Sequence, residues 1–112
     1  MAKVIISKDL KNEIFKKFKD ESISIFNLMK TLETNPQKGK NISHISEVII
    51  KELKYKKFRF YCVTNGRVLK FGTEEELTNL IIKFVKMSEK KDQEKVIKEI
   101  KEVLRKFGFD EV

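Results

Sequence analysis

Cysteine and histidine are almost absent from this 112-residue chain, which contains only Cys62 and His44. A single cysteine cannot form an intrachain disulfide, and no Cys/His spacing of a metal site is present. Cys62 falls on an apolar strand pattern and is expected to be a buried small hydrophobe. His44 has no obvious partner for acid–base catalysis, so we do not favour it as a catalytic residue. We therefore expect neither a metal nor another cofactor.

Long apolar runs are also missing. The opening segment MAKVIISKDL contains too short an apolar run for a secretory signal peptide, and no stretch is long enough to form a membrane-spanning helix. There is no internal repeat and no low-complexity tail. A chain of this length supports one modest core. We expect residues 1–112 to form a single cytoplasmic domain without membrane contact.

Positive charge is in excess. The chain has 25 Lys and Arg residues against 17 Asp and Glu residues, a formal net charge of +8. The excess is concentrated in residues 51–70, which contain seven basic residues and one acid. A local basic excess predicts a polyanionic partner, and nucleic acid is the favoured class. The alternative is a solvated, lysine-rich surface of the kind found in proteins of thermophiles.

The stretch Glu47–Phe71 is rich in Val, Ile, Phe and Tyr and predicts strands separated by turns. A basic turn at Lys56-Lys57 separates the first two strands. Asn65-Gly66 is typical of a two-residue hairpin turn, so we expect Phe58–Thr64 to pair with Arg67–Phe71.

Alternation along these strands predicts two faces. The apolar face is expected to contain Ile49, Leu53, Tyr55, Phe58, Phe60 and Cys62. The opposite face is expected to contain Glu52, Lys54, Arg59, Tyr61 and Val63. Because it combines an acid, a lysine, an arginine and a tyrosine, this second, polar face is the predicted functional surface.

The N-terminal third predicts a strand and two helices. Lys3–Ile6 is a short apolar run, and Ser7 is placed to cap a helix over residues 8–19. A second helix is expected over residues 21–34, although its SISIF portion is also compatible with a strand. Asn35-Pro36 ends it, because the residue before proline avoids the helical region.

The C-terminal third predicts a capped helical turn, a strand and a long helix. Thr73 and Glu76 have capping-box spacing, which indicates a short helix over 74–79. Residues 80–87 follow as a strand, and residues 92–107 as an amphipathic helix that ends at Gly108. The expected fold class is α+β: a curved antiparallel sheet, a helical hairpin on one face, and the last helix at an edge or end.

This order of elements, with several short motifs, resembles the RelE/ParE superfamily of bacterial and archaeal toxins over roughly residues 3–105. The motifs that carry the resemblance are Asn35-Pro36 followed by Gly39-Lys40, Glu52-Leu53-Lys54, Phe58-Arg59-Phe60-Tyr61, and Phe84–Lys91 with Gln93. The last of these is similar to a segment of HigB-like members.

RelE-like and HigB-like toxins cut messenger RNA, usually on the ribosome, and are silenced by a cognate antitoxin. The resemblance therefore implies the endoribonuclease toxin of a type II toxin–antitoxin system, with messenger RNA, the ribosome and an acidic antitoxin as partners. ParE-like relatives poison DNA gyrase instead, so a gyrase-binding toxin is one alternative. A non-catalytic RNA-binding relative is another.

RNA cleavage by the 2′-OH needs a proton acceptor, positive charge at the phosphate and a proton donor for the 5′ oxygen. The resemblance and the polar face indicate Glu52, Lys54, Arg59 and Lys86 as catalytic residues. The planar guanidinium of Arg59 is suited to grip two oxygens of the phosphate. Lys54, with Glu52 or Tyr61 beside it, is the expected proton acceptor. Lys86 or Lys90 is the expected proton donor. Further RNA contacts are expected from Lys38, Lys40, Lys56, Lys57, Lys90 and Tyr61, the last by stacking on a base. The alternative is a surface charge cluster of little consequence.

Overall fold

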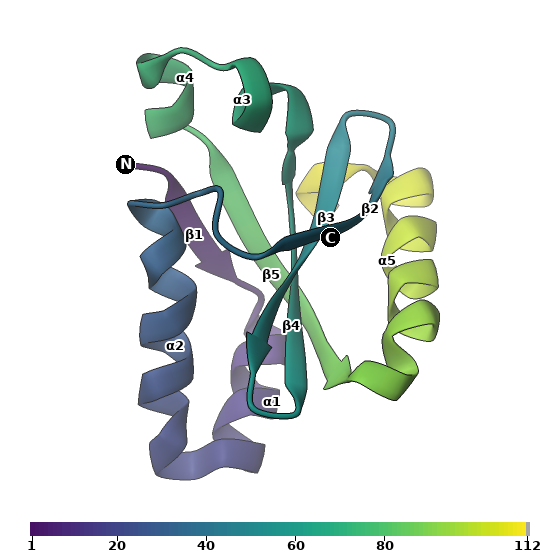
Figure 1. Ribbon diagram of the computed structural model, residues 1–112. Helices are drawn as coiled ribbons and strands as arrows, with labels where there is room; N and C mark the ends of the chain where they lie inside the picture. Colours follow the sequence, from purple (N-terminus) through teal and green to yellow (C-terminus); the bar gives the residue numbers. More distant parts are fainter. Residues whose placement is uncertain (112) are drawn as a thin grey trace.

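One mixed sheet occupies the centre of the computed structural model, which describes residues 1–111 (Figure 1). Within these residues the five strands lie in the order β1-β5-β4-β3-β2. Their bounds are β1 Lys3–Ile6, β2 Lys40–Ile45, β3 Val48–Tyr55, β4 Phe58–Asn65 and β5 Ile81–Glu89. The expected α+β class is confirmed. The prediction that all strands are antiparallel is wrong at one strand pair, because β1 runs parallel to β5. The other neighbouring strands are antiparallel.

Two N-terminal helices cover one face of the sheet, as predicted. Ser7 caps α1 (Lys8–Phe18) by accepting a hydrogen bond from the backbone N–H of Leu10 at 3.3 Å. A 3₁₀ turn leads into α2 (Ser22–Lys30), so the SISIF segment is helical and the strand alternative is excluded. A second 3₁₀ turn over Thr31–Glu33 precedes Pro36. We call the sheet surface under these helices the α1–α2 face.

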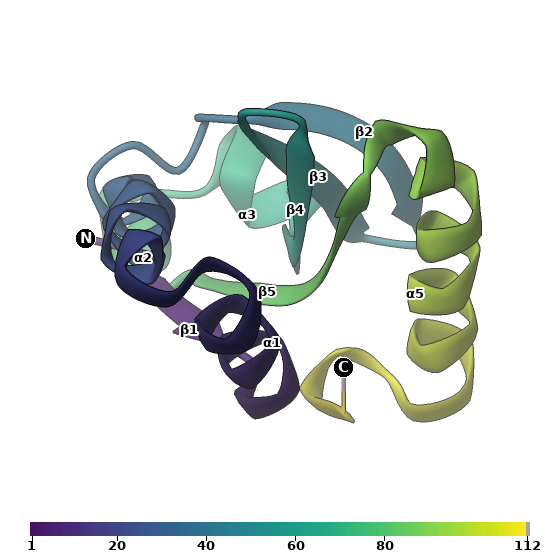
Figure 2. The ribbon, with the colours of Figure 1, turned by 90° about the horizontal axis from the view of Figure 1, so that it is seen from below.

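The last helix, α5 (Gln93–Phe107), packs on the opposite face of the sheet (Figure 2). Its expected extent and its end at Gly108, which has φ 81°, are confirmed. Its expected position at an edge or end is wrong. Its buried stripe contacts three apolar strand residues that point away from α1 and α2, namely Ile50, Tyr61 and Val63. We call this second surface the α5 face.

The Asn65-Gly66 pair does not form a hairpin turn. Asn65 is the N-cap of α3 (Gly66–Phe71), and its side chain accepts a hydrogen bond from the N–H of Val68 at 2.9 Å. A Cβ on Gly66 would lie 2.5 Å from Cγ1 of Ile49, so glycine allows α3 to approach β3 closely. Because residues 66–71 are helical, β4 pairs with β5 instead. The capping box of Thr73 and Glu76 is confirmed at α4 (Glu74–Thr78).

The predicted alternation along β4 is confirmed. Phe60 and Cys62 belong to the core of the α1–α2 face, while Tyr61 and Val63 belong to a smaller core under α5. The basic turn at Lys56-Lys57 joins β3 to β4 as expected. The second face is therefore polar over only part of its area, because α5 covers an apolar patch on it.

Candidate nucleic-acid interface

Strand register gathers polar residues at the end of the α5 face near the start of α5. Lys54 of β3 lies opposite Arg59 of β4, and Arg59 lies opposite Ser88 of β5. Directly cross-strand partners share a face of the sheet. We use the name polar cluster for Glu52, Lys54, Arg59, Lys86, Ser88 and Gln93. The predicted catalytic residues Glu52, Lys54, Arg59 and Lys86 thus lie on one surface.

A bulge in β5 puts Lys86 on this surface. Lys86 lies opposite Tyr61 and Phe84 opposite Cys62, which leaves Val85 as the extra residue. Val85 packs against the core under α5, and the exposed Lys86 follows it on the same face. Without the extra residue, alternation would turn Lys86 towards the α1–α2 face.

Two contacts hold Arg59 in place, and a third holds its partner Glu52. Its Nε lies 3.2 Å from Oε2 of Glu52, and both side chains are only 11% exposed. Its Nη1 donates to the carbonyl of Phe58 at 3.2 Å. The same Glu52 oxygen accepts a hydrogen bond from Nε2 of Gln93, at the start of α5, at 3.1 Å. The guanidinium is therefore fixed, and the two formal charges of the pair offset each other.

The remaining positive charge of the polar cluster comes from lysines. Lys54 and Lys86 are exposed, and neither forms an ion pair within residues 1–111. Lys40 lies opposite Glu52 on β2 and so adds a third exposed lysine to the α5 face. Each ammonium is free to meet a phosphate.

Tyr61 does not meet the expectation that it stacks on a base. Its ring is fully buried under α5, and its hydroxyl forms a 2.8 Å hydrogen bond with Oγ of Ser88. Burial is the main cause that raises the pKa of the Tyr61 hydroxyl. Because no face of the ring is open, the residue supports the cluster rather than contacting RNA.

The other predicted RNA contacts divide into two groups. Lys57 and Lys90 are exposed on the β3–β4 turn and directly after β5, at the same end of the sheet as Arg59. Lys56 is exposed on that turn too, but it forms an ion pair with Glu21. Lys38 donates to Oγ1 of Thr31 at 3.0 Å, next to α2, and is not part of the polar cluster.

Three features of the site escaped the sequence interpretation. Ser88 and Gln93 hold Tyr61 and Glu52, and only the strand register and the start of α5 bring them there. Lys51, one of the seven basic residues of the central stretch, is buried on the α1–α2 face, where it donates to the carbonyl of Pro36 at 2.6 Å. Desolvation lowers the pKa of Lys51. The surface is therefore less basic than the local residue count implies.

Within residues 1–111, no group of three or more His, Cys, Asp or Glu side chains is arranged to hold a metal ion. In the same described part of the chain, no helix has the length and apolarity needed to cross a membrane. Comparisons with protein-family models, with curated proteins and with solved structures found no match.

Proposed function

We propose that this chain is an RNA-cleaving toxin that engages single-stranded RNA through the polar cluster. The observation that carries the proposal is the row formed by Arg59 and its exposed lysine neighbours. A rigid guanidinium lies between Lys54 on one side and the segment of β5 that carries Lys86 on the other. Such a row offers several charged donors to one phosphate. The resemblance to RelE-like toxins supports the same assignment.

Each residue has a separate role in the proposed cleavage of RNA. The 2′ oxygen attacks the adjacent phosphorus and loses its proton to Glu52, the bond from phosphorus to the 5′ oxygen breaks, and the Lys54 ammonium adds positive charge beside the phosphate. Arg59 stabilises the charge that builds on the phosphate oxygens, and Lys86 gives a proton to the departing 5′ oxygen. The products are a 2′,3′-cyclic phosphate and a free 5′-hydroxyl. An acidic antitoxin segment that neutralises Lys54 and Lys86 would silence the site.

A non-catalytic RNA-binding protein is the second candidate. The observation in its favour is the engagement of Arg59 by Glu52, because a guanidinium already paired with a carboxylate has less capacity to grip a phosphate. In this case the exposed lysines hold RNA by charge alone, and affinity falls steeply as salt rises.

Cleavage of single-stranded RNA, with and without ribosomes, tests the proposal through Arg59→Ala. We expect cleavage to slow by roughly 100- to 1000-fold, since Arg59 is a donor aimed at transition-state charge. Arg59→Lys should recover little of the rate, because a point charge does not reproduce the planar fork. Arg105→Ala, which removes an exposed arginine from the last turn of α5, is the matched control and should cleave like the parent.

Two outcomes would overturn the proposal. If folded Arg59→Ala protein cleaves RNA at the parent rate and still inhibits growth on expression, the polar cluster is not the catalytic site. If the parent binds RNA in a salt-dependent manner but leaves it intact even on ribosomes, the RNA-binding candidate replaces the nuclease.

A further inference from the structure

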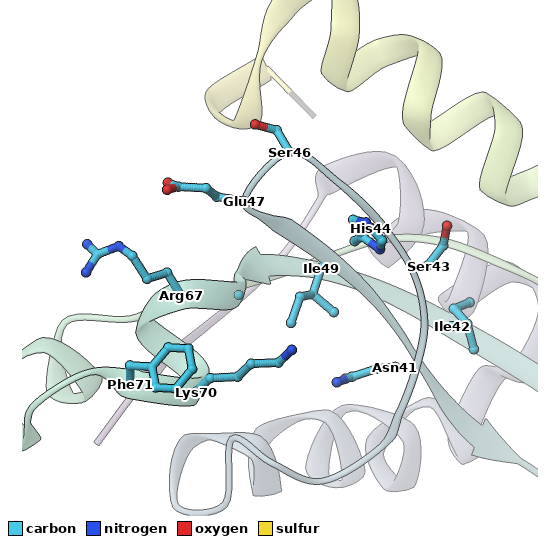
Figure 3. A pocket seen from close by; sticks show the side chains of 11 residues that line it. Asn41, Ile42, Ser43, His44, Ser46, Glu47, Ile49, Arg67, Lys70 and Phe71 are labelled. Atoms are coloured by element: carbon cyan, nitrogen blue, oxygen red, sulfur yellow. The ribbon is translucent and has the colours of Figure 1, made fainter.

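A pocket of about 520 Å³ opens between β2 and α3 (Figure 3). Ile49 contributes an apolar wall from β3. Asn41 and His44 line the pocket from β2, and Lys70 and Phe71 from α3. His44 lies opposite Ile49 in the strand register, which puts both on the α1–α2 face, beside the area that the two helices cover.

The pocket carries donors without protein partners. Within residues 1–111, the side chains of Asn41, His44 and Lys70 take part in no hydrogen bond or ion pair. Figure 3 shows the Lys70 amine directed across the pocket towards Asn41, with the Phe71 ring beside it. The Phe71 ring is 80% exposed and is therefore open to contact with a ligand.

The frame of the pocket is held firmly. The backbone N–H of Gly66 donates to the carbonyl of Glu47 at 2.6 Å, which ties the start of α3 to the β2–β3 turn. The absence of a side chain at Gly66 lets this helix lie directly against Ile49. A preformed pocket that combines an apolar wall, an aromatic ring and a few polar groups is typical of a small-ligand site.

We infer that this pocket binds one nucleotide, with its phosphate at Lys70 and its base against Phe71. A lysine ammonium is a compact partner for a phosphate, and an open aromatic ring is a stacking surface for any base. Asn41 and His44 supply donors to the sugar and phosphate oxygens. Arg67 and Glu47, which also line the pocket, lie away from the Lys70 amine in Figure 3. The site does not depend on the proposed cleavage at the polar cluster.

Titration of the isotope-labelled protein with 5′-AMP, inorganic phosphate and adenosine, followed by amide NMR spectra, tests the inference. We expect 5′-AMP to shift the amides of Asn41, His44 and Lys70 and to bind more tightly than phosphate or adenosine alone. Lys70→Met should weaken 5′-AMP binding roughly 10- to 100-fold, the effect of one hydrogen bond to a charged group. Phe71→Ala should weaken it as well. Glu47→Gln should tighten it by about two- to fivefold, because a repelling surface charge is removed.

Lys98→Met, which removes an exposed lysine of α5 on the other face, is the matched control and should leave 5′-AMP binding unchanged. A parent-like affinity in Lys70→Met protein would overturn the inference, as would shifts confined to the polar cluster. A 5′-phosphorylated RNA oligonucleotide that displaces 5′-AMP from the pocket would identify the nucleotide as part of an RNA strand. If RNA leaves 5′-AMP in place, the ligand is a free nucleotide.

Discussion

The two faces of one sheet differ in how completely they are covered. On the α1–α2 face, two helices and their connections bury Phe60, Cys62 and Phe84 in one continuous core. On the α5 face, a single helix covers Ile50, Tyr61 and Val63 and leaves the end beyond its first turn open. Alternate residues of the same strands form both faces. The packing of helices over a face therefore decides whether that surface becomes core or remains available for binding. The polar cluster lies where the cover of α5 ends.

The largest expected effect comes from removing a ring from the part of the α1–α2 face that the two helices cover. Phe60 is completely buried and its ring packs at 6.2 Å from that of Phe18 and 6.5 Å from that of Tyr55, measured between centroids. We expect Phe60→Ala to lower the free energy of unfolding by about 3–5 kcal/mol, through lost burial and the cavity left behind. Urea unfolding followed by circular dichroism measures the change.

Lys54→Ala, one strand away on the partly covered face, is the comparison variant for Phe60→Ala. An exposed side chain without a partner should change the free energy of unfolding by less than about 0.5 kcal/mol. Equal losses in the free energy of unfolding for Phe60→Ala and Lys54→Ala would contradict the difference in helix cover between the two faces.

Local chemistry made several elements predictable from the sequence. The caps at Ser7 and Thr73 depend on residues three positions apart, and the stripe of α5 repeats with the helical period. The predicted hairpin turn at Asn65-Gly66 is wrong, because an Asn side chain that suits a turn can also cap a helix. Here it accepts a hydrogen bond from the N–H three residues on. Which of the two forms depends on packing against Ile49, and no local pattern encodes that contact.

Contacts between distant segments were the least predictable part of the fold and of the site. β1 pairs with β5 across nearly eighty residues, and a four-residue strand contains no signal for its partner or direction. Alternation placed Glu52, Lys54 and Arg59 on one face correctly. It could not show that Gln93 reaches Glu52, that α5 buries Tyr61, or that Lys51 is buried, because each depends on where a remote segment packs.

Breaking the ion pair of Glu52 and Arg59, at the open end of the α5 face, is expected to have the next largest effect. Glu52→Ala leaves the guanidinium of Arg59, which is only 11% exposed, without its carboxylate partner. We expect a loss of about 1–3 kcal/mol in the free energy of unfolding, the cost of an unsatisfied and partly buried charged group. The double variant Glu52→Ala/Arg59→Ala should lose less than the sum of the single changes, because the orphaned charge is gone.

Glu21→Gln provides the matched control, since Glu21 pairs with Lys56 on the exposed β3–β4 turn. An exposed pair is screened by water and salt, so this variant should unfold almost like the parent. Strictly additive losses at Glu52 and Arg59 would contradict the view that the pair is an energetic unit.

The smallest and most specific effect comes from two titratable groups on the covered face. Lys51 and Cys62 lie opposite each other on β3 and β4, and both are buried. Burial lowers the pKa of Lys51 from its ordinary 10.5 and raises the pKa of the Cys62 thiol from 9.0 to about 12. The folded state thus releases the Lys51 proton more readily than the unfolded state, and holds the Cys62 proton more tightly.

The two groups therefore give the free energy of unfolding opposite dependences on pH. For Lys51 the unfolded chain binds more protons than the folded one as pH approaches 10.5, so stability rises with pH. For Cys62 the unfolded chain loses its proton first, so stability falls above pH 9 by up to about 1.4 kcal/mol per pH unit.

Urea unfolding of the parent, Lys51→Met and Cys62→Ala from pH 8 to pH 10 separates the two slopes. Relative to the parent, Lys51→Met should lose stability more steeply as pH rises, and Cys62→Ala less steeply. Other titrating groups are common to all three proteins and cancel in the comparison, so parallel curves would show that neither group is buried as the structure places it.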